Sequence, residues 1–200
     1  VIEDCAEALG SQYQGAHVGT FGDAATFSFF GNKTITTGEG GMLLFKDSSV
    51  RSRAKMLRDH GMSPERRYWH EEIGFNYRLT NLQAAIGVAQ LEKVDSFVKR
   101  KRWIASEYKK YLIDMPQFQL PTEPQCEQGQ NSYWIYTIVL NPEFHSRRNE
   151  ILDLLKMRGI EARPVFFPLH LMPLYTRYGL GDEHYSNANY LSNGGISLPS

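Results

Sequence analysis

The stretch AATFSFFGNKTITTGEGGMLLF, residues 24–45, decides how the first part of this chain folds. Small or polar residues alternate with aromatic ones over residues 24–30, and residues 41–45 are mostly apolar, so both segments are predicted to be β-strands. Between them lie a lysine, Lys33, and a run of glycines. A lysine at such a corner is most often a solvated surface charge. The stretch therefore raises the question of why one amine stands beside a glycine-rich turn.

Elements on either side of this stretch predict an α/β fold. Residues 1–4 read as a strand. Asp47, Ser48 and Ser49 offer N-caps for a helix that reaches Arg58 and is closed by Gly61. Strands alternating with helices favour a sheet with parallel or mixed pairing. Thr80 and Gln83 form a capping box. We expect a helix of about thirty residues to follow it, reaching Leu112 and bending near residues 95–96.

The second half of the chain predicts a smaller α/β unit. Residues 114–131 are polar and read as a linker, followed by a strand at 133–140, a helix at 147–158 and a strand at 160–167. We expect residues 1–92 to be the C-terminal part of a large domain. Residues 93–200 would be a long connecting helix and a small C-terminal domain. Since the chain opens with Val1 inside a buried-strand pattern, we expect the front of a longer protein to be absent, leaving apolar sheet edges exposed.

Composition excludes several classes of function. Lys plus Arg and Asp plus Glu both number 22, so no net field favours a polyanion, and nucleic acid is disfavoured as a partner. Cys5 and Cys126, the two cysteines, have no metal-ligand spacing, so we expect no metal site and no disulfide. This usage fits a reducing cytoplasm. No run of 18 apolar residues is present, so no membrane helix is expected.

Two nucleotide-binding motifs fail on inspection. Asn32 stands where a phosphate-binding loop needs glycine directly before its lysine. Leu43 takes the place of the third glycine in a dinucleotide fingerprint.

What remains is a carboxylate, a hydroxyl and an amine at the ends of neighbouring strands. Asp4 follows the first strand, Ser28 lies in the next, and Lys33 comes just after it. In an α/β sheet, ligands collect outside the carboxyl ends of strands. These groups are what pyridoxal phosphate requires: an amine for its aldehyde, a carboxylate for its ring nitrogen and a hydroxyl for its phosphate. Taken singly, Asp4 also reads as a helix cap and Ser28 as an ordinary strand hydroxyl.

Long strings of the sequence resemble the DegT-type sugar aminotransferases, a fold-type I family that uses pyridoxal phosphate. The strings are VIEDCAEALGS, GTFGDAATFSFFGNKTITTGEGG and GFNYRLTNLQAAIGVAQLE, and the likeness continues through RPVFFPLHLMPLY to the terminal SLPS. The resemblance implies transfer of an amino group from L-glutamate to the 4-keto group of a nucleotide-linked 4-keto-6-deoxy sugar. Within the family, the resemblance favours GDP-4-keto-6-deoxymannose as the substrate, in the biosynthesis of surface polysaccharide and O-antigen.

The resemblance also implies roles for single residues. Lys33 would bond covalently to the cofactor and carry protons, and Asp4 would pair with the pyridinium nitrogen. Glu7 would lie beside the ring and its phenolic oxygen, where relatives often have Gln or His, so its protonation state stays open. Ser28 would contact the phosphate. Asn76 would reach the phosphate in the neighbouring subunit, which implies a homodimer with shared active sites, although the residue alone reads as a turn.

Further implications concern the substrate and the rest of the protein. Arg163, Phe166 and His170 would line the sugar-nucleotide cleft. Family members carry an N-terminal segment with further phosphate-binding amides, which this sequence lacks, so the activity belongs to the full-length protein. Two alternatives stay open: a keto-sugar dehydratase, whose relatives replace the lysine with histidine, and a non-catalytic regulator or scaffold.

Overall fold

The chain forms two compact units in the computed structural model, which describes residues 1–123, 128–178 and 182–200. Unit 1 contains Val1–Arg100 and the described part of Pro124–Trp134. Unit 2 contains Lys101–Glu123 and the described part of Ile135–Ser200. The predicted assignment of residues 1–92 and 93–200 to two domains of a larger fold stays a prediction. Cys5 is buried and free, and Cys126 lies outside the described residues.

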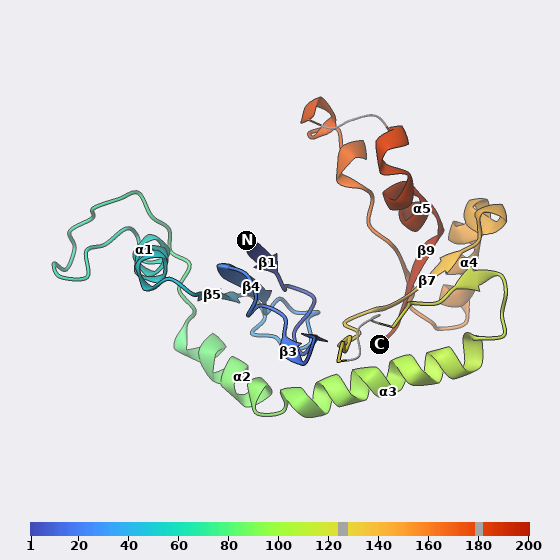
Figure 1. The fold of residues 1–200 in the computed structure, drawn as a ribbon, viewed down its shortest axis with the longest axis horizontal. Helices are drawn as coiled ribbons and strands as arrows, with labels where there is room; N and C mark the ends of the chain where they lie inside the picture. The colour runs from blue at the N-terminus through green and yellow to red at the C-terminus, as the bar shows by residue number, and fades with distance from the viewer. Residues whose placement is uncertain (124–127, 179–181) are drawn as a thin grey trace. The chain divides into compact units, whose positions relative to one another are not determined.

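A mixed three-stranded sheet is the centre of unit 1 (Figure 1). Its order is β1 (Ile2–Asp4), β4 (Ala24–Ser28) and β5 (Gly41–Phe45), with β1 parallel to β4 and β5 antiparallel to it. The strand predicted over residues 24–30 ends at Ser28, because the Phe29 carbonyl accepts the amide of Thr37 and closes a loop. A short hairpin of β2 (Gln12–Tyr13) and β3 (Ala16–His17) was not predicted.

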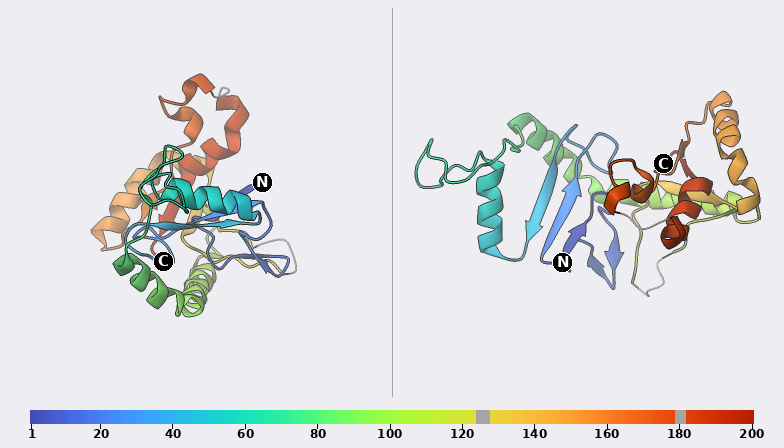
Figure 2. Two further views of the ribbon diagram at one scale, coloured as in Figure 1. Left: turned by 90° about the vertical axis from the view of Figure 1, so that its left-hand side faces the viewer. Right: turned by 90° about the horizontal axis from the view of Figure 1, so that it is seen from above.

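Two helices of unit 1 begin at the caps that the sequence predicts. The Asp47 side chain accepts the amides of Ser49 and Val50 at the start of α1 (Ser48–Arg58). Thr80 and Gln83 form the complete capping box of α2 (Asn81–Leu91), which satisfies amides that the first helical turn leaves unpaired. Figure 2 shows α1 and α2 in two further views.

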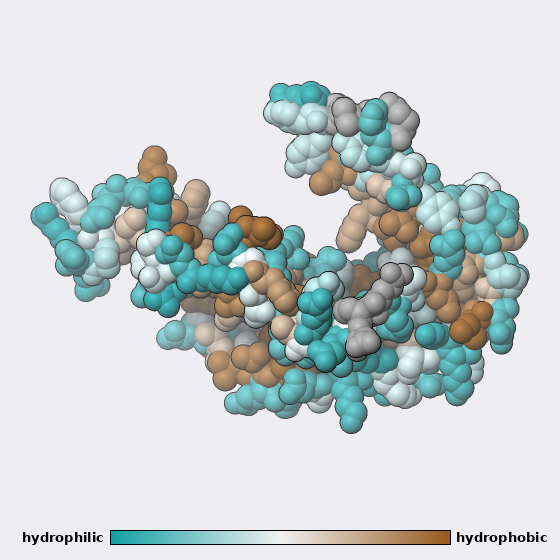
Figure 3. Space-filling view, viewed as in Figure 1, coloured by the Kyte–Doolittle hydropathy of each residue, from teal (hydrophilic) through white to brown (hydrophobic). Residues whose placement is uncertain are grey.

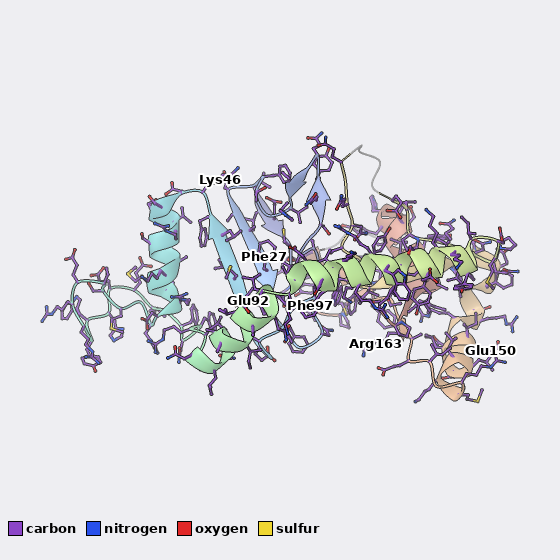
Figure 4. All side chains as sticks on the ribbon, turned by 90° about the horizontal axis from the view of Figure 1, so that it is seen from below. Phe27, Lys46, Glu92, Phe97, Glu150 and Arg163 are labelled. Carbon is purple, nitrogen blue, oxygen red and sulfur yellow. The ribbon has the colours of Figure 1, made fainter. Side chains whose placement is uncertain are left out.

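The predicted thirty-residue helix is wrong, because the structure contains two helices. α2 ends at Leu91 and α3 (Val94–Leu112) begins after a break at Glu92 and Lys93. The Lys93 amide bonds to the Gln90 carbonyl, which tightens the last turn, and the Lys93 carbonyl accepts both the amide and the hydroxyl of Ser96. Figure 4 labels Glu92 at the break and Phe97 in the first turn of α3. The chain therefore interrupts the helix a few residues before the predicted bend.

Unit 2 is built on an antiparallel four-stranded sheet in the order β6-β7-β9-β8. The strands are β6 (Phe118–Gln119), β7 (Tyr136–Leu140), β8 (Arg163–Pro164) and β9 (Gly195–Leu198), and the helices are α4 (Arg148–Met157) and α5 (Ser186–Gly194). Short 3-10 turns lie at η1 (Pro142–Arg147), η2 (Leu169–Leu171), η3 (Thr176–Tyr178) and η4 (Asp182–Tyr185).

Several predictions for unit 2 need correction. β7 begins at Tyr136, three residues later than predicted, and the strand expected over residues 160–167 contains only Arg163–Pro164. Pro164 lacks an amide for the ladder, which limits that strand to an edge position beside β9. β6, β9 and α5 were missed, β6 because it lies inside the polar segment read as a linker. The helix predicted over residues 147–158 is confirmed as α4.

Each unit has its own core and an apolar surface. In unit 1 the buried residues include Cys5, Ala25, Phe29, Ile35 and Val98, and in unit 2 Tyr136, Ile138, Leu140 and Ile196. Several apolar side chains are exposed, among them Met42 and Leu43 on β5 and Leu82 on α2. Figure 3 shows apolar residues, coloured brown, at the surface. None of the helices in the described residues combines the length and the hydropathy that a membrane span requires. Nor do the described residues place three or more His, Cys, Asp or Glu side chains where they could hold a metal ion.

Candidate active site

The carboxyl ends of β1 and β4 place Asp4, Ser28 and Lys33 at one edge of the sheet. Asp4 is the last residue of β1, and the parallel register sets it opposite Thr26 of β4. Ser28 ends β4 two residues further along, and Lys33 follows in the connection to β5. Because parallel strands end at the same edge, the predicted carboxylate, hydroxyl and amine come to one region of unit 1.

Asp4 presents an oriented carboxylate. Its Oδ1 accepts the backbone amide of Ala6 at 3.1 Å and the hydroxyl of Thr26 at 3.2 Å. The residue is exposed. These bonds hold the carboxylate toward the end of β4 while it stays accessible to a ligand.

Lys33 is not the solvated surface charge that its position in the sequence suggests. Its Nζ donates to Glu7 Oε1 at 3.2 Å and lies 4.0 Å from the centroid of the Trp134 ring. The Lys33 side chain is 13% exposed, whereas that of Glu7 is 51% exposed. The amine is therefore held between a carboxylate and an aromatic face, with its stem covered by protein.

The backbone around Lys33 is fixed by hydrogen bonds within unit 1. The Lys33 amide bonds to the Phe30 carbonyl at 3.0 Å, and the Thr36 amide bonds to the side chain of Gln90 on α2 at 2.9 Å. Phe29, Ile35 and Thr37 of the same connection are buried. Lys33 thus extends from a rigid support, which a reacting group needs for defined geometry.

Glycine is required where β5 passes β4. A Cβ on Gly41 would lie 2.5 Å from the Phe27 carbonyl oxygen, and Gly40 has a φ of 137°. Gly41 pairs with Ser28, whose hydroxyl accepts the Phe30 amide at 3.3 Å. By contrast, a Cβ on Gly31 would meet only the Gly38 carbonyl oxygen, at 3.9 Å. The connection is therefore tight at Gly41 and has room for a side chain at Gly31.

Cys5, directly after Asp4, offers no reactive thiolate. Burial raises the pKa of the Cys5 thiol, and the carboxylates of Glu3 and Asp4 raise it further. A thiol with a raised pKa stays protonated at neutral pH and is a poor nucleophile. The reactive group at this edge is the Lys33 amine.

This set of side chains fits pyridoxal phosphate in kind. Lys33 supplies an enclosed amine, Asp4 an exposed carboxylate that can accept from a protonated ring nitrogen, and Ser28 a hydroxyl that can donate to a phosphate. Glu7 is the fourth predicted residue at this edge, through its bond to Lys33.

The other predicted residues lie elsewhere. Asn76 is exposed and forms an isolated bridge with Asp59 at the end of α1. Arg163, Phe166 and His170 belong to unit 2, where Figure 4 marks Arg163. Arg163 bonds to Glu161 at 2.9 Å, Phe166 is 76% exposed and His170 stacks on Tyr185 with ring centroids 4.4 Å apart. Their roles stay predictions.

Trp134 is the residue at this edge that the sequence did not predict. It belongs to unit 1 and its indole lies over Lys33, although the two residues are far apart in the chain. The sequence gives one indirect signal, a Tyr-Trp pair at the start of a predicted strand, and that pattern reads equally well as core packing.

Known proteins resemble the chain over its whole length. It is 47% identical to the GDP-perosamine synthase of Escherichia coli O157:H7 over 201 aligned residues, and 44% identical to that of Vibrio cholerae over 200. All of the chain is covered, with 52% and 53% of those relatives, so it spans about half the length of the curated relatives it matches.

A solved structure shows the same fold. PseC of Helicobacter pylori, an aminotransferase involved in the biosynthesis of pseudoaminic acid, superposes with a TM-score of 0.90 at 32% identity. The match covers 99% of this chain and 53% of PseC. The expected α/β fold is therefore confirmed as that of about half a sugar aminotransferase.

The family comparison agrees with the site. Residues 1–200 match the DegT/DnrJ/EryC1/StrS aminotransferases, which depend on pyridoxal phosphate, the cofactor that the residues at the sheet edge fit. The match extends from the strand that carries Asp4 to the end of the chain, and the resemblance seen in the sequence is confirmed. This chain belongs to the DegT/DnrJ/EryC1/StrS aminotransferase family.

Proposed function

We propose that this protein transfers an amino group from L-glutamate to the 4-keto group of a nucleotide-linked 4-keto-6-deoxy sugar. The observation that carries the proposal is the Lys33 amine, held 3.2 Å from Glu7 at the sheet edge where Asp4 ends β1. A regulator or scaffold needs no enclosed amine paired with a carboxylate at this edge of the sheet. We assign this proposed activity to the complete protein.

Each residue at the edge has a proposed task. Pyridoxal phosphate, when bound, supplies the electron-withdrawing ring that lets a proton leave the carbon next to the amino nitrogen. The Lys33 Nζ would act as general base when it accepts a proton from the substrate carbon, and as general acid when it gives that proton to the cofactor carbon. The Asp4 carboxylate would keep a pyridine nitrogen protonated, and the Ser28 hydroxyl would donate to a phosphate oxygen. Glu7 would hold the charged form of the Lys33 amine when it is free.

The proposed sugar is GDP-4-keto-6-deoxymannose, with GDP-perosamine as the product. The names of the two bacterial relatives support this substrate, at 44% to 47% identity. Arg163, Phe166 and His170 are the proposed contacts to the sugar nucleotide. The proposed setting is the cytoplasm, in surface polysaccharide or O-antigen biosynthesis.

A homodimer with shared active sites is also proposed. Asn76 is exposed, as a residue that reaches a partner's phosphate must be. Leu82 on α2 is 79% exposed, and Ile86, Val88 and Leu91 of the same helix are exposed as well. Apolar surface of this extent is typical of faces that another chain or further residues of the same chain cover. Sedimentation equilibrium of the complete protein measures whether it is a dimer.

The decisive experiment replaces Lys33 with alanine in the complete protein. We expect Lys33→Ala to abolish the visible absorbance of the covalently held cofactor and to lower turnover by at least the order of 10²–10⁴ that proton transfer contributes. Lys109→Ala, an exposed lysine on α3, is the matched control and should keep both. Retained absorbance together with retained turnover would contradict the proposal.

The same preparation separates the alternatives. Assays with L-glutamate and a panel of keto sugar nucleotides identify the acceptor, and formation of a deoxygenated sugar without amine incorporation would indicate a dehydratase. The Lys33 side chain argues against that reaction, whose relatives have histidine there. A regulator or scaffold would show no saturable binding of pyridoxal phosphate in a titration.

A further inference from the structure

A late segment of the chain returns to unit 1 and is held there by backbone hydrogen bonds. The amide and carbonyl of Gln130 pair with those of Gln12 in β2, at 2.9 and 2.8 Å. The Gly15 amide bonds to the Gln128 carbonyl at 3.1 Å. Residues 128–130 therefore act as an additional extended segment beside the β2–β3 hairpin.

The attachment is strongest directly before Trp134. The Ser11 hydroxyl accepts the Ser132 amide at 3.0 Å and donates to the Ser132 hydroxyl at 3.0 Å. Ser132 is 1% exposed. Buried hydroxyls and amides that are paired in this way resist displacement, because breaking them leaves polar groups unsatisfied. The backbone that leads into Trp134 is thus fixed against the same unit that carries Lys33.

Trp134 then contacts the Lys33 region twice. Its indole Nε1 donates to the Asn32 carbonyl at 2.8 Å, and its ring face lies 4.0 Å from the Lys33 Nζ. One side chain therefore holds the backbone just before Lys33 and the amine at the end of Lys33. Trp134 is 9% exposed, so water has little access to the ring.

We propose that Trp134 is the positioning residue of Lys33. The ring face and the Glu7 carboxylate give the free ammonium two attractive partners, and the indole N–H fixes the loop from which the lysine extends. The amine returns to one place whenever it is not bonded to the cofactor. This inference rests on the proposed function only for the identity of the reaction, since the contacts themselves are those of the protein alone.

The alternative interpretation is that Trp134 is an ordinary packing residue whose contact with Lys33 has no role in positioning the amine. The two readings differ in what happens to the amine when the ring is removed. Loss of packing lowers stability but leaves the Glu7 pair to hold Lys33 in place. Loss of a positioning contact increases access of small reagents to the amine and slows turnover without changing substrate affinity.

The experiment uses the complete protein freed of cofactor, with Trp134→Leu and Trp134→Phe. Trp134→Leu removes both contacts, whereas Trp134→Phe keeps an aromatic face and removes the N–H donor. Acetic anhydride acylates accessible amines, and mass spectrometry gives the rate at Lys33 relative to that at Lys109. We expect acylation of Lys33 to rise about tenfold in Trp134→Leu, the factor expected for losing one cation–π contact and one hydrogen bond. The acylation rate of Lys33 in Trp134→Phe should lie between the rates in Trp134→Leu and in the wild type.

A matched control and a kinetic readout complete the test. Trp103→Leu replaces an exposed tryptophan of unit 2 and should leave acylation of Lys33 unchanged. In the cofactor-loaded protein, Trp134→Leu should lower kcat about tenfold with KM for the sugar nucleotide unchanged. If Trp134→Leu does not fold, Trp134→Phe decides alone, and an acylation rate equal to the wild type overturns the inference.

Borohydride reduction distinguishes failure of this inference from failure of the proposed function. Reduction after loading fixes pyridoxal phosphate to the amine that holds it, and mass spectrometry locates that amine. Label on a residue other than Lys33 would refute the proposed function, while the acylation rates would still show whether Trp134 holds Lys33. Label on Lys33, with acylation equal in Trp134→Leu and wild type, would refute the positioning role and leave the function standing.

Discussion

Two loops that the sequence assigns to the site are held in different ways. In residues 29–40 of unit 1, bonds within the loop are supplemented by bonds to a neighbouring helix: the Thr36 amide bonds to Gln90 of α2, and the Glu39 carbonyl accepts the side chain of Gln83. Phe29 and Ile35 are buried. In residues 165–178 of unit 2, Leu171, Met172, Tyr175 and Tyr178 all donate to carbonyls three residues before them. Phe166, Phe167 and Leu169 of that loop are exposed. The first loop is therefore bonded to a neighbouring helix and partly buried, whereas the turns of the second are closed by bonds within the loop.

The difference matches what each loop is proposed to do. A lysine that moves protons needs a fixed starting point, and the connection after β4 provides one. A loop that contacts a sugar nucleotide can tolerate local turns with exposed aromatic side chains, because the ligand itself can cover them. Substitutions that crowd the packed backbone at or beside the first loop should therefore disturb the fold, and those in the second should disturb substrate binding.

The largest expected effect is that of Gly41→Ala, beside the first loop. Its Cβ would lie 2.5 Å from the Phe27 carbonyl oxygen, so the backbone of β4 or β5 must shift. We expect the free energy of unfolding to fall by about 1–3 kcal/mol, as for other overpacked sites. Urea denaturation of the complete protein, followed by circular dichroism, measures it.

Gly31→Ala is the matched control for this prediction. Gly31 lies in the same connection, and its added Cβ would make only an ordinary contact with the Gly38 carbonyl oxygen, at 3.9 Å. Its free energy of unfolding should change by less than about 0.5 kcal/mol. Equal losses in the two variants would mean that the connection is not held as the contacts indicate.

A smaller and different effect is expected for Phe166→Ala in the second loop. Its side chain is 76% exposed, so the free energy of unfolding should change by less than about 0.5 kcal/mol. Under the proposed function, loss of an aromatic contact should raise KM for the sugar nucleotide about tenfold and leave kcat nearly unchanged. Steady-state kinetics at saturating L-glutamate test this. A fall in kcat at constant KM would place Phe166 with the chemistry instead of with binding.

The smallest effect is expected for Glu3, whose side chain holds a turn of unit 1 through hydrogen bonds to backbone amides that lie far away in the sequence. Its carboxylate accepts the amides of Gly19, Phe21 and Gly22 at 2.6–2.8 Å. The Gly22 and Gly19 bonds, chiefly, lower the pKa of Glu3 below its ordinary value of 4.5. A carboxylate with a lowered folded-state pKa stabilises the fold above its unfolded pKa, and the contribution is lost as the pH falls through the folded value.

Glu3→Gln should therefore lower the urea midpoint at pH 7, and the gap to the wild type should narrow as the pH falls below about 4. Glu143→Gln, an exposed carboxylate of η1, is the control and should leave the midpoint unchanged at both pH values. A gap that stays constant from pH 7 down to pH 3 would show that the charge of Glu3 does not contribute.

Patterns with a short range in the sequence predicted much of the fold. The strand Gly41–Phe45 and the caps of α1 and α2 occur as expected. The break after Leu91 was misplaced because Glu92 and Lys93 are good helix formers, and a carbonyl shared by the Ser96 amide and hydroxyl interrupts the helix there. β9 was missed because it is short, and its partners β7 and β8 lie far away in the chain.

The sequence by itself determined the family, the approximate places of β1, β4, β5, α1 and α4, and the kinds of groups that stand at the ends of β1 and β4. Such features depend on periodicity, caps and long characteristic strings, all of which are local. Only the tertiary structure decided that Glu7 and Trp134 enclose the Lys33 amine. The Trp134 indole and the Asn32 carbonyl are separated by 102 positions, and Ser132, two residues before Trp134, is bound by Ser11. Pairings at such distances depend on how the folded chain closes on itself, and no local pattern records them.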